Sequence, residues 1–465
     1  MYDIGIIGGG PGGYTAAIFA AKKGKKVVLI EREKLGGTCL NVGCIPTKAL
    51  IHSASVYSEI QNAEAFGIKV KDVKIDWEQI QENKNSIVSS LTNGIKGLLK
   101  HNKIDVVFGE AELMDLNTIS VTNGESKKQL IAENIIIATG SKAIIPNIPG
   151  SDLTDIITST EALSLEKIPD RLVIVGGGVI GTEMGYIYNC LGVEVTIIEM
   201  LPKILGNMDD ECSEFMANEL QKKGIRIAAN SKVISFEKGR NGITVKYQQE
   251  NEIKEIQTDK VLMSIGRSPN LEVAEKINLK IDHKGIIVNN DLRTQIPNIY
   301  AIGDVTGKIQ LAHVAAHQGI IAVKNILGEN KKMGYDIVPS CIYTNPEMAS
   351  VGLTEEEANK KYKQLMNISI FPYSHNGKSL TLGNTKGFIK IISEKKHNQV
   401  IGVHIIGPYA TEMIGEAGLA IQLECTSEEI ASTIHAHPTL SEAFMEAAAG
   451  IVDEAIHIVN PLKNN

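Results

Sequence analysis

Two closely spaced cysteines, Cys39 and Cys44, are the residues of this chain whose type and spacing first suggest chemistry. They lie in the run Gly-Gly-Thr-Cys-Leu-Asn-Val-Gly-Cys-Ile-Pro-Thr-Lys, residues 36–48. Such a pair could ligate a metal, but zinc sites usually add a second cysteine pair or nearby histidines, which this segment lacks. It could also be a pair of inert buried thiols. That is how we interpret the four isolated cysteines, Cys190, Cys212, Cys341 and Cys425.

A redox-active disulfide is the interpretation that we favour for Cys39 and Cys44. In an ideal helix two residues five apart have Cα atoms about 8.6 Å apart. A disulfide tolerates about 7 Å, so a bridge here requires a distorted start of a helix. A strained and accessible disulfide is easily reduced, which suits a residue pair that cycles between dithiol and disulfide.

A glycine-rich pattern occurs twice, after the strand-like residues 6–7 and 173–175. Each copy continues into a helix, a second strand and a terminal acid, Glu31 or Glu199, and the two copies keep the same internal spacing. In such a G-x-G-x-x-G turn the first glycine permits the tight turn and the second lets the backbone approach a pyrophosphate, while the third packs the helix on the strand. The candidate dinucleotide-binding glycines are Gly8, Gly10 and Gly13 in the first copy and Gly178 and Gly181 in the second.

The second copy also indicates which nicotinamide cofactor is used. The Glu199 carboxylate can accept hydrogen bonds from ribose hydroxyls, and it would repel a 2′-phosphate. The residues that follow it, Met200-Leu201-Pro202, supply no arginine to bind such a phosphate. We therefore expect NAD rather than NADP.

A histidine and a glutamate near the C-terminus, His437 and Glu442, form a candidate base. His437 precedes a proline, and Glu442 lies five residues further on, where a carboxylate could hold the imidazole tautomer. Only a thiolate attacks a disulfide, so a base that deprotonates a thiol would complement the cysteine pair. We interpret His435 as a structural residue.

The elements that must position these residues follow an α/β pattern. Strand-like segments rich in β-branched residues alternate with helical segments through most of the first 330 residues. The chain has 465 residues, a length typical of about three domains. Its 43 glycines indicate many tight turns and close approaches of the backbone to ligands.

Composition excludes several classes of function. The formal net charge is −7 and the chain has no basic stripe, which argues against nucleic-acid binding. No run of about 20 apolar residues could span a membrane. Asp3 stands where an export signal would carry positive charge, and six cysteines are too few for a disulfide scaffold. We expect a cytoplasmic protein with no membrane and no nucleic-acid partner.

Taken together, these motifs resemble the pyridine nucleotide–disulfide oxidoreductase flavoproteins over essentially the whole length. The resemblance includes Ala-Thr-Gly at 138–140, Gly-Arg at 266–267, Tyr-Ala-Ile-Gly-Asp at 300–304 and His-Ala-His-Pro-Thr-Leu-Ser-Glu at 435–442. Within this family the cysteine run, the Gly-Thr-Glu-Met-Gly at 181–185 and the C-terminal motif resemble the dihydrolipoyl dehydrogenases. The resemblance implies two Rossmann-like domains, for FAD and NAD, and a C-terminal α+β dimerisation domain.

The resemblance also assigns residues to the cofactors. It places Cys44 beside the flavin, with Lys48 and Glu183 as an ion pair near the reactive flavin nitrogen; an ordinary surface pair is the alternative. It implies that Asp304 bonds the ribityl chain of FAD. Further residues implied to contact FAD are Glu31, Ala111, Thr139, Gly140 and Ala312, and those implied to line the NAD side are Val233 and Gly266. It implies no metal.

By the same resemblance the expected segments are an FAD domain at 1–145, an NAD domain at 146–270, a central segment completing the FAD domain at 271–338 and an interface domain at 339–465. His437 and Glu442 are implied to reach the disulfide of a partner subunit, which makes a homodimer the functional unit. The implied reaction oxidises dihydrolipoyl groups with NAD+ through Cys39, Cys44 and FAD. The lipoyl group would arrive on an acyltransferase of a 2-oxo acid dehydrogenase complex or on a glycine cleavage carrier protein.

Two other functions remain open at this point. One is another NAD-linked disulfide or peroxide reductase with the same parts and a different substrate. The other is a flavin- and NAD-binding regulatory protein, which would need the glycine-rich motifs but not Cys39, Cys44, His437 and Glu442 together.

Overall fold

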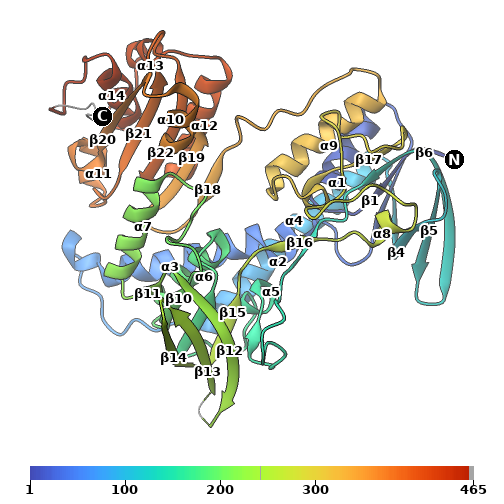
Figure 1. Ribbon diagram of the computed structural model, residues 1–465, viewed down its shortest axis with the longest axis horizontal. Helices are drawn as coiled ribbons and strands as arrows, with labels where there is room; N and C mark the ends of the chain where they lie inside the picture. Colours follow the sequence, from blue (N-terminus) through green and yellow to red (C-terminus); the bar gives the residue numbers. More distant parts are fainter. Residues whose placement is uncertain (241, 460–465) are drawn as a thin grey trace.

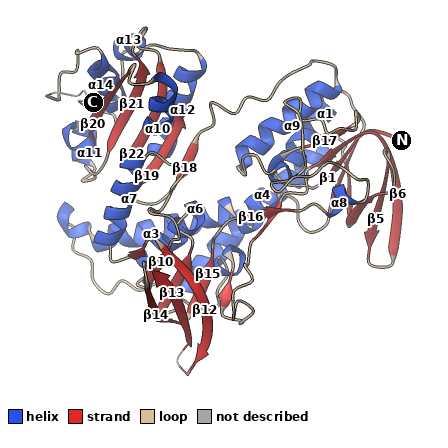
Figure 2. Ribbon diagram, viewed as in Figure 1, coloured by secondary structure: helices blue, strands red, loops and turns tan. Residues whose placement is uncertain are grey.

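The computed structural model describes residues 1–240 and 242–459. It confirms the α/β class, with two parallel sheets in the first two thirds of the chain and an antiparallel sheet at its C-terminal end (Figures 1 and 2). None of the described helices is both long enough and apolar enough to cross a bilayer.

The first sheet has a parallel part in the order β3-β2-β1-β6-β17 and an antiparallel extension through β5 and β4. Its strands are β1 (Tyr2–Ile7), β2 (Val27–Glu31), β3 (Asp105–Phe108), β4 (Glu110–Leu113), β5 (Thr118–Asn123), β6 (Ser126–Ile137) and β17 (Ile299–Ala301). Strand β2 is buried along its whole length and β1 along its last four residues, as is typical of parallel strands covered on both faces. Ile4 and Ile6 of β1, for example, are fully buried.

Two helices from distant parts of the sequence, α1 (Pro11–Lys22) and α9 (Ala312–Ile326), lie side by side against this sheet (Figure 1). Glycines permit the close contact. A Cβ on Gly319 would lie 2.6 Å from the backbone oxygen of Gly12, and a Cβ on Gly12 would lie 3.1 Å from the backbone oxygen of Ala315. The segment after residue 299 thus returns to the first sheet by strand pairing and by helix packing.

The second parallel sheet has the order β11-β10-β9-β15-β8 and carries an antiparallel ribbon of three strands. Its elements are β8 (Ile156–Ile157), α5 (Ser159–Ala162), β9 (Arg171–Val175), α6 (Val179–Cys190), β10 (Glu194–Ile198), α7 (Asp210–Lys222), β11 (Arg226–Ala228), β12 (Ser231–Gly239), β13 (Gly242–Gln249), β14 (Glu252–Thr258) and β15 (Lys260–Met263). The short strands β7 (Ser141–Ala143) and β16 (Arg267–Pro269) pair with each other between the two parallel sheets, and α8 (Glu272–Glu275) follows.

The redox segment lies on two consecutive helices, α2 (Gly37–Val42) and α3 (Cys44–Gln61). They are followed by a 3₁₀ turn, Ala63–Phe66, and by α4 (Trp77–His101).

The C-terminal sheet is antiparallel in the order β18-β19-β22-β21-β20. Its strands are β18 (Ser340–Ile342), β19 (Glu347–Gly352), β20 (Met366–Pro372), β21 (Phe388–Glu394) and β22 (Val400–Gly407). The helices of this part are α10 (Glu355–Tyr362), α11 (Gly377–Thr381), α12 (Ala410–Gln422), α13 (Ser427–Ser432) and α14 (Glu442–Ile451).

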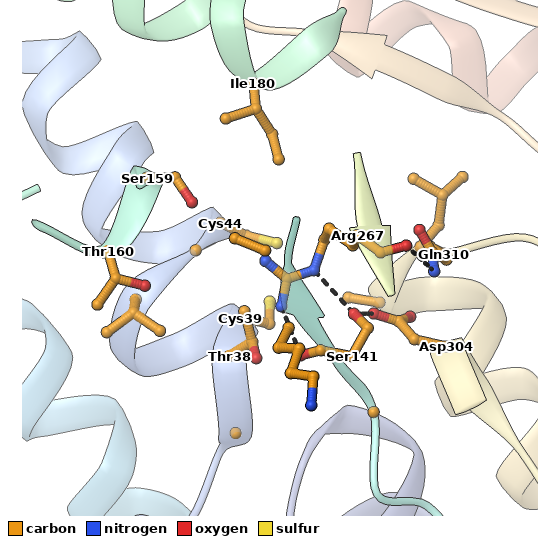
Figure 3. Close-up of a pocket in the computed structure, with 18 of the residues that line it drawn as sticks. Thr38, Cys39, Cys44, Ser141, Ser159, Thr160, Ile180, Arg267, Asp304 and Gln310 are labelled. Carbon is orange, nitrogen blue, oxygen red and sulfur yellow. Dashed lines mark hydrogen bonds between the residues drawn. The ribbon is translucent and has the colours of Figure 1, made fainter. Parts of the chain in front are cut away.

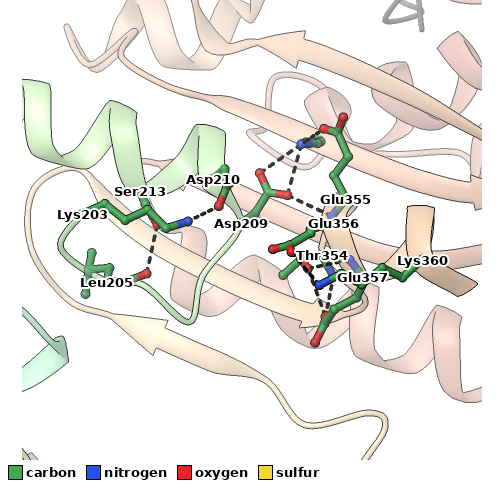
Figure 4. A network of polar contacts seen from close by, with 11 residues as sticks. Lys203, Leu205, Asp209, Asp210, Ser213, Thr354, Glu355, Glu356, Glu357 and Lys360 are labelled. Carbon is green, nitrogen blue, oxygen red and sulfur yellow. Dashed lines mark hydrogen bonds and ion pairs between the residues drawn. The ribbon is translucent and has the colours of Figure 1, made fainter. Parts of the chain in front are cut away.

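A buried ion network joins the second parallel sheet to this C-terminal part. Lys390 on β21 is fully buried, and its Nζ lies 3.0 Å from Asp209, which precedes α7, and 2.5 Å from Glu355 on α10. Glu211 on α7 lies 2.8 Å from the same Nζ. Figure 4 shows Asp209 and Glu355 approaching each other from the two parts. Burial acts to lower the pKa of the Lys390 ammonium, but the surrounding carboxylates raise it above its ordinary value, so the lysine stays charged.

Candidate active site

The two cysteines are held by a break between two helices. Cys39 lies on α2, Cys44 is the first residue of α3, and Gly43 between them is non-helical at φ −145° and ψ −115°. A Cβ on Gly43 would lie 2.9 Å from the backbone oxygen of Thr38. The interruption is the distortion that the five-residue spacing requires. Cys39 and Cys44 are free cysteines in the structure.

The thiols differ in their tendency to ionise. A hydrogen bond from Cys39 lowers the pKa of Cys44 to about 7 against the effect of burial, and the Lys48 ammonium adds to the lowering. The same hydrogen bond, together with burial, raises the pKa of Cys39 well above its ordinary value. Cys44 is therefore the thiolate of the pair, and Cys39 is the protonated thiol.

Lys48, one turn along α3 from Cys44, is paired with Glu183 on α6. Lys48 Nζ lies 2.9 Å from both carboxylate oxygens of Glu183, whose side chain is 5% exposed. The backbone N–H of Tyr343 donates to the same carboxylate, and the ammonium lies 4.3 Å from the centre of the Tyr343 ring. The burial of Glu183 is not that of an ordinary surface pair. Beside Cys44 the contact therefore joins α3 to α6 and to Tyr343, which directly follows β18 of the C-terminal sheet.

The two glycine-rich turns have matching geometries. Gly8 and Gly176 have φ of +110° and +106°, and a Cβ on either would lie within 2.6 Å of a backbone oxygen of the neighbouring strand end. Gly13 and Gly181 each lie against the first glycine of their own turn. A Cβ on Gly13 would lie 1.8 Å from the backbone oxygen of Gly8, and a Cβ on Gly181 would lie 2.0 Å from that of Gly176. The third glycine of each copy therefore serves helix packing, and neither lines the cavity described below.

The terminal acids are also held in the same way. Glu31 accepts a hydrogen bond from the backbone N–H of Gly9 at 2.7 Å, and Glu199 accepts one from Gly177 at 2.6 Å. The second oxygen of each carboxylate accepts a backbone N–H two residues further along the chain. These contacts fix each carboxylate at the edge of its turn, where a ribose would lie.

A cavity of about 2090 Å³ connects the two turns and the cysteine pair. It exceeds the ~300–1,000 Å³ of a pocket for one small ligand. It is lined by both cysteines and by most of the predicted cofactor residues, Gly8, Gly10, Glu31, Lys48, Ala111, Thr139, Gly140, Gly178, Glu183, Glu199, Val233, Gly266, Asp304 and Ala312.

The lining of this cavity fits two dinucleotides. The helices α1, α6 and α9 begin at the cavity, and none of the three has a side-chain cap on its N-terminus. Their first N–H groups are therefore available to anionic phosphates. Gly10 and Gly178 are the residues that precede α1 and α6. A Cβ on Gly178 would meet no protein atom within 4 Å, and one on Gly10 would meet only the Cα of Gly37 at 3.9 Å. A side chain there would occupy the volume that a pyrophosphate needs.

A polar chain crosses the cavity close to the cysteines. Arg267 donates to the Ser141 hydroxyl at 2.8 Å and to the Ser141 backbone oxygen at 2.7 Å, and Ser141 Oγ lies 2.5 Å from Asp304. Figure 3 shows Arg267 between the two cysteines and the Ser141–Asp304 pair. Sequence reasoning assigned no role to Arg267 or Ser141. The Gly-Arg motif at 266–267 and the residue following Ala-Thr-Gly were the signals that could have found them.

The candidate base is formed as a pair of side chains, at a different place from the cysteines. His437 Nδ1 lies 2.8 Å from Glu442 Oε1, and the other oxygen of Glu442 accepts the backbone N–H of Thr439 at 2.8 Å. Partial burial acts to raise the pKa of Glu442, but these hydrogen bonds hold it below its ordinary value. Among the residues described, neither His437 nor Glu442 lines the cavity, and α14 lies far from α2 and α3 (Figure 1).

The two histidines of the C-terminal motif have different surroundings. The His437 side chain is 80% exposed, and only its Nδ1 is bonded. The His435 side chain is 6% exposed, with Nε2 on Glu416 at 2.9 Å and Nδ1 on the backbone oxygen of Thr433 at 2.8 Å. His435 therefore has both ring nitrogens engaged by its own chain, whereas Nε2 of His437 is available. Within the described part of the chain, no group of three or more His, Cys, Asp or Glu residues is arranged to hold a metal ion.

A dithiol placed between two dinucleotide turns defines a disulfide oxidoreductase that works with a flavin and a nicotinamide nucleotide. The chain belongs to the pyridine nucleotide-disulphide oxidoreductase family, which it matches over residues 2–319, and residues 338–448 match the dimerisation domain of that family. This confirms the expected family, and with it FAD and NAD as the cofactors of the chain. The dimerisation domain supports a homodimer.

Relatives match along the whole chain. Dihydrolipoyl dehydrogenase from Geobacillus stearothermophilus is 43% identical over 458 residues, which cover 98% of this chain and 97% of that protein. Dihydrolipoyl dehydrogenase from Bacillus subtilis (strain 168) is 43% identical over 472 residues, covering 98% and 99%. Among solved structures, the HOCl-induced flavoprotein disulfide reductase RclA from Escherichia coli, in its Cu(II) complex, has a TM-score of 0.87 at 28% identity. That alignment covers 96% of this chain and 99% of the RclA chain.

Proposed function

We propose that the protein oxidises protein-bound dihydrolipoyl groups to lipoyl groups, with NAD+ as the final electron acceptor. The observation that carries this proposal is the Cys39–Cys44 pair in the cavity between the two dinucleotide turns, where the pKa of Cys44 is lowered and that of Cys39 is raised. A dithiol substrate that reduces a Cys39–Cys44 disulfide leaves a matching state, with Cys44 as the thiolate. The relatives named dihydrolipoyl dehydrogenase support the choice of substrate.

The proposed disulfide exchange takes place in two steps, and each thiol proton has an acceptor. His437, oriented by Glu442, removes the proton from one thiol of the substrate, and the resulting thiolate attacks Cys39 Sγ. The Cys39–Cys44 bond breaks, and Cys44 leaves with the electron pair as a thiolate. The second substrate thiol then attacks the first substrate sulfur, which closes the lipoyl disulfide, and its proton passes to Cys39 as that sulfur leaves.

The charges around Cys44 favour this direction of attack. A leaving thiolate departs more easily when its pKa is low, and the pKa of Cys44 is lowered by the Cys39 hydrogen bond and by Lys48. FAD, when bound, would supply the remaining chemistry, the transfer of two electrons between the dithiol and NAD+. The residues proposed to hold FAD are Gly8, Gly10, Glu31, Lys48, Ala111, Thr139, Gly140, Asp304 and Ala312. Those proposed to hold NAD are Gly178, Glu183, Glu199, Val233 and Gly266. Gly13 and Gly181, expected from the sequence to bind the dinucleotides, instead pack their helices against the first glycine of each turn.

The base is proposed to act across the dimer. Within one chain, α14 lies away from the cysteine pair, and the exposed His437 is free to face a second subunit. A homodimer in which each subunit offers His437 and Glu442 to the other's cysteines would complete two sites. The further partner is proposed to be a lipoyl-bearing protein, either the acyltransferase of a 2-oxo acid dehydrogenase complex or the carrier protein of glycine cleavage. We propose the cytoplasm as its location.

His437→Gln is the variant that tests this function. It removes the base but leaves the cysteines and the cofactor cavity unchanged, so dihydrolipoamide oxidation should fall by about 10²–10⁴-fold. NADH-dependent dye reduction needs no thiol proton and should persist. His435→Gln is the matched control and should retain most of both activities, because His435 is engaged within its own chain. Equal loss of both activities in His437→Gln with FAD still bound would contradict the assignment.

The substrate class is tested on the unmodified enzyme. NADH formation from free dihydrolipoamide is measured beside the same assay with glutathione as the thiol. Rapid turnover of dihydrolipoamide and none of glutathione is expected. The reverse preference would favour the alternative of another NAD-linked disulfide reductase.

A further inference from the structure

A second histidine–glutamate pair lies on the same helix as Glu442. Glu446 is 5% exposed, and its Oε1 lies 2.7 Å from Nδ1 of His457. Its Oε2 accepts the backbone N–H groups of Ile456 and His457 at 3.0 and 3.2 Å. The His457 side chain is 68% exposed. A buried carboxylate therefore holds an exposed imidazole by its Nδ1 and leaves Nε2 outward.

This pair repeats the design of His437 and Glu442. In both pairs one carboxylate oxygen binds Nδ1 of the histidine and the other accepts backbone N–H groups. Glu442 and Glu446 are four residues apart on α14, so they share a face, with Cβ atoms roughly 5–6 Å apart. In the part of the chain that is described, Nε2 of neither His437 nor His457 has a hydrogen-bond partner.

The two pairs lie close enough to interact electrostatically. The pKa of Glu442 is lowered against the effect of its partial burial, and the contributing groups are Thr439, His437 and, more weakly, His457. A positive charge on one imidazole is thus felt at the carboxylate that holds the other.

The imidazole of His457 is not needed to anchor the C-terminal segment. Glu446 already binds this segment through two backbone N–H groups, and Ile458 packs against the core of the C-terminal part. A glutamine at position 457 would keep the backbone hydrogen bonds. Anchoring of the C-terminal segment therefore does not explain why an imidazole with an exposed Nε2 is present at position 457.

The proposed reaction creates a need that a second imidazole meets. Of the two thiol protons of dihydrolipoyl, one leaves with the hydride, and the other remains on His437 as an imidazolium proton after the exchange. His437 must lose this proton before the next substrate can be deprotonated. A lipoyl arm and a partner subunit lying over His437 would restrict its access to water.

We propose that His457, held by Glu446, takes the proton from the His437 imidazolium and passes it to water. The inference rests on the proposed function. The transfer breaks the Nε2–H bond of His437 and forms an Nε2–H bond on His457, by way of intervening water, and no electrons are exchanged. His457 acts through His437 and touches neither the substrate nor the cofactors.

The test uses the FAD-loaded dimer with His457→Gln and dihydrolipoamide and NAD+ as substrates. Without the second imidazole, kcat should fall by about tenfold, less than the ~10²–10⁴-fold expected for loss of a direct base. KM for dihydrolipoamide should stay unchanged. Imidazole added to the buffer should restore kcat, because a soluble base of the same kind can accept the proton. NADH-dependent dye reduction should match the unmodified enzyme, which also shows that the variant is folded.

His435→Gln is the control and should show neither the loss nor the response to imidazole. The proposal is overturned if His457→Gln keeps its kcat, if only KM rises, or if the loss of kcat does not respond to imidazole. A rise in KM alone would place His457 in substrate binding. Failure of the proposed function is a separate result, seen as an unmodified enzyme that does not oxidise dihydrolipoamide or as a His437→Gln variant with full activity.

Discussion

Replacement of Cys39 by alanine removes the hydrogen bond that contributes most to the low pKa of Cys44. In the structure that hydrogen bond and the Lys48 charge lower the pKa of Cys44 from an ordinary 9.0 to about 7. At pH 7 about half of Cys44 is then thiolate, against about one molecule in a hundred at the ordinary value. Because Lys48 remains in the variant, we expect a rise of about one pKa unit or more. The thiolate fraction at pH 7 would then be about a tenth.

The measurement is the rate of alkylation of Cys44 by iodoacetamide in the reduced enzyme. Only the thiolate reacts, so the rate at each pH reports its fraction, and mass spectrometry of the Cys44 peptide separates it from the other cysteines. The unmodified protein should titrate near pH 7, and Cys39→Ala should react about fivefold more slowly at that pH.

Cys39→Ser is the matched control, because its hydroxyl still donates to Cys44 and the pKa of Cys44 should rise less than in Cys39→Ala. An alkylation profile that is the same in Cys39→Ala and in the unmodified protein would refute the reasoning. The asymmetry of the pair would then come from Lys48 or from the start of α3, and not from Cys39.

Two further predictions concern the cofactor choice and the joint between the domains. Glu199→Gln combined with Met200→Arg should raise kcat/KM for NADP+ relative to NAD+. The change removes a carboxylate that repels the 2′-phosphate, and it gives an exposed residue of the cavity lining a side chain that can bind this phosphate. An unmodified enzyme that already prefers NADP+ would contradict this prediction. Lys390→Met removes the ammonium that compensates the buried Asp209 carboxylate, so it should lower the free energy of unfolding by roughly 3–5 kcal/mol, measured by urea denaturation. The control is Lys360→Met, which removes an exposed ion pair with Glu356 on the same helix and should lower the free energy of unfolding by less than about 0.5 kcal/mol. Equal effects of the two variants would show that the buried network does not hold the domains together.

The dinucleotide turns could be predicted from the sequence because each is a local structure. The tight turn, the helix start and the terminal acid lie within about 25 residues, and their spacing alone determines which residues meet. The structure shows the outcome in both copies, with Gly9 bonded to Glu31 and Gly177 bonded to Glu199. The α/β class followed from the same alternation of strands and helices.

Contacts between distant segments could not be predicted in this way. Ser141 and Asp304 are separated by 163 positions, and Asp209 and Lys390 by 181. No periodicity or motif links such residues, since only the packing of whole sheets brings them together. Glu446 and His457 are only 11 positions apart, but this separation matches no sequence motif that would predict a contact between them. Their one signal was a glutamate four residues after Glu442 on the same helix face.

The helix break at Gly43 lies between these two cases. The five-residue spacing of the cysteines indicated that a regular helix could not hold a disulfide, but not where the irregularity would fall. Thr38 determines the position, because its backbone oxygen leaves no room for a side chain on residue 43. A glycine is therefore required where the chain turns from α2 into α3.

Under the proposed function, electrons and protons are handled on different parts of the chain. The cysteines and the cavity for both nucleotides lie between the two parallel sheets, so the electron path is contained within one subunit. The imidazoles that accept protons lie with α14 on the C-terminal part, away from that cavity (Figure 1). A single chain thus holds a complete redox path and an incomplete thiol-oxidising site. Dimerisation is then a chemical requirement, because it brings the base of one subunit to the disulfide of the other.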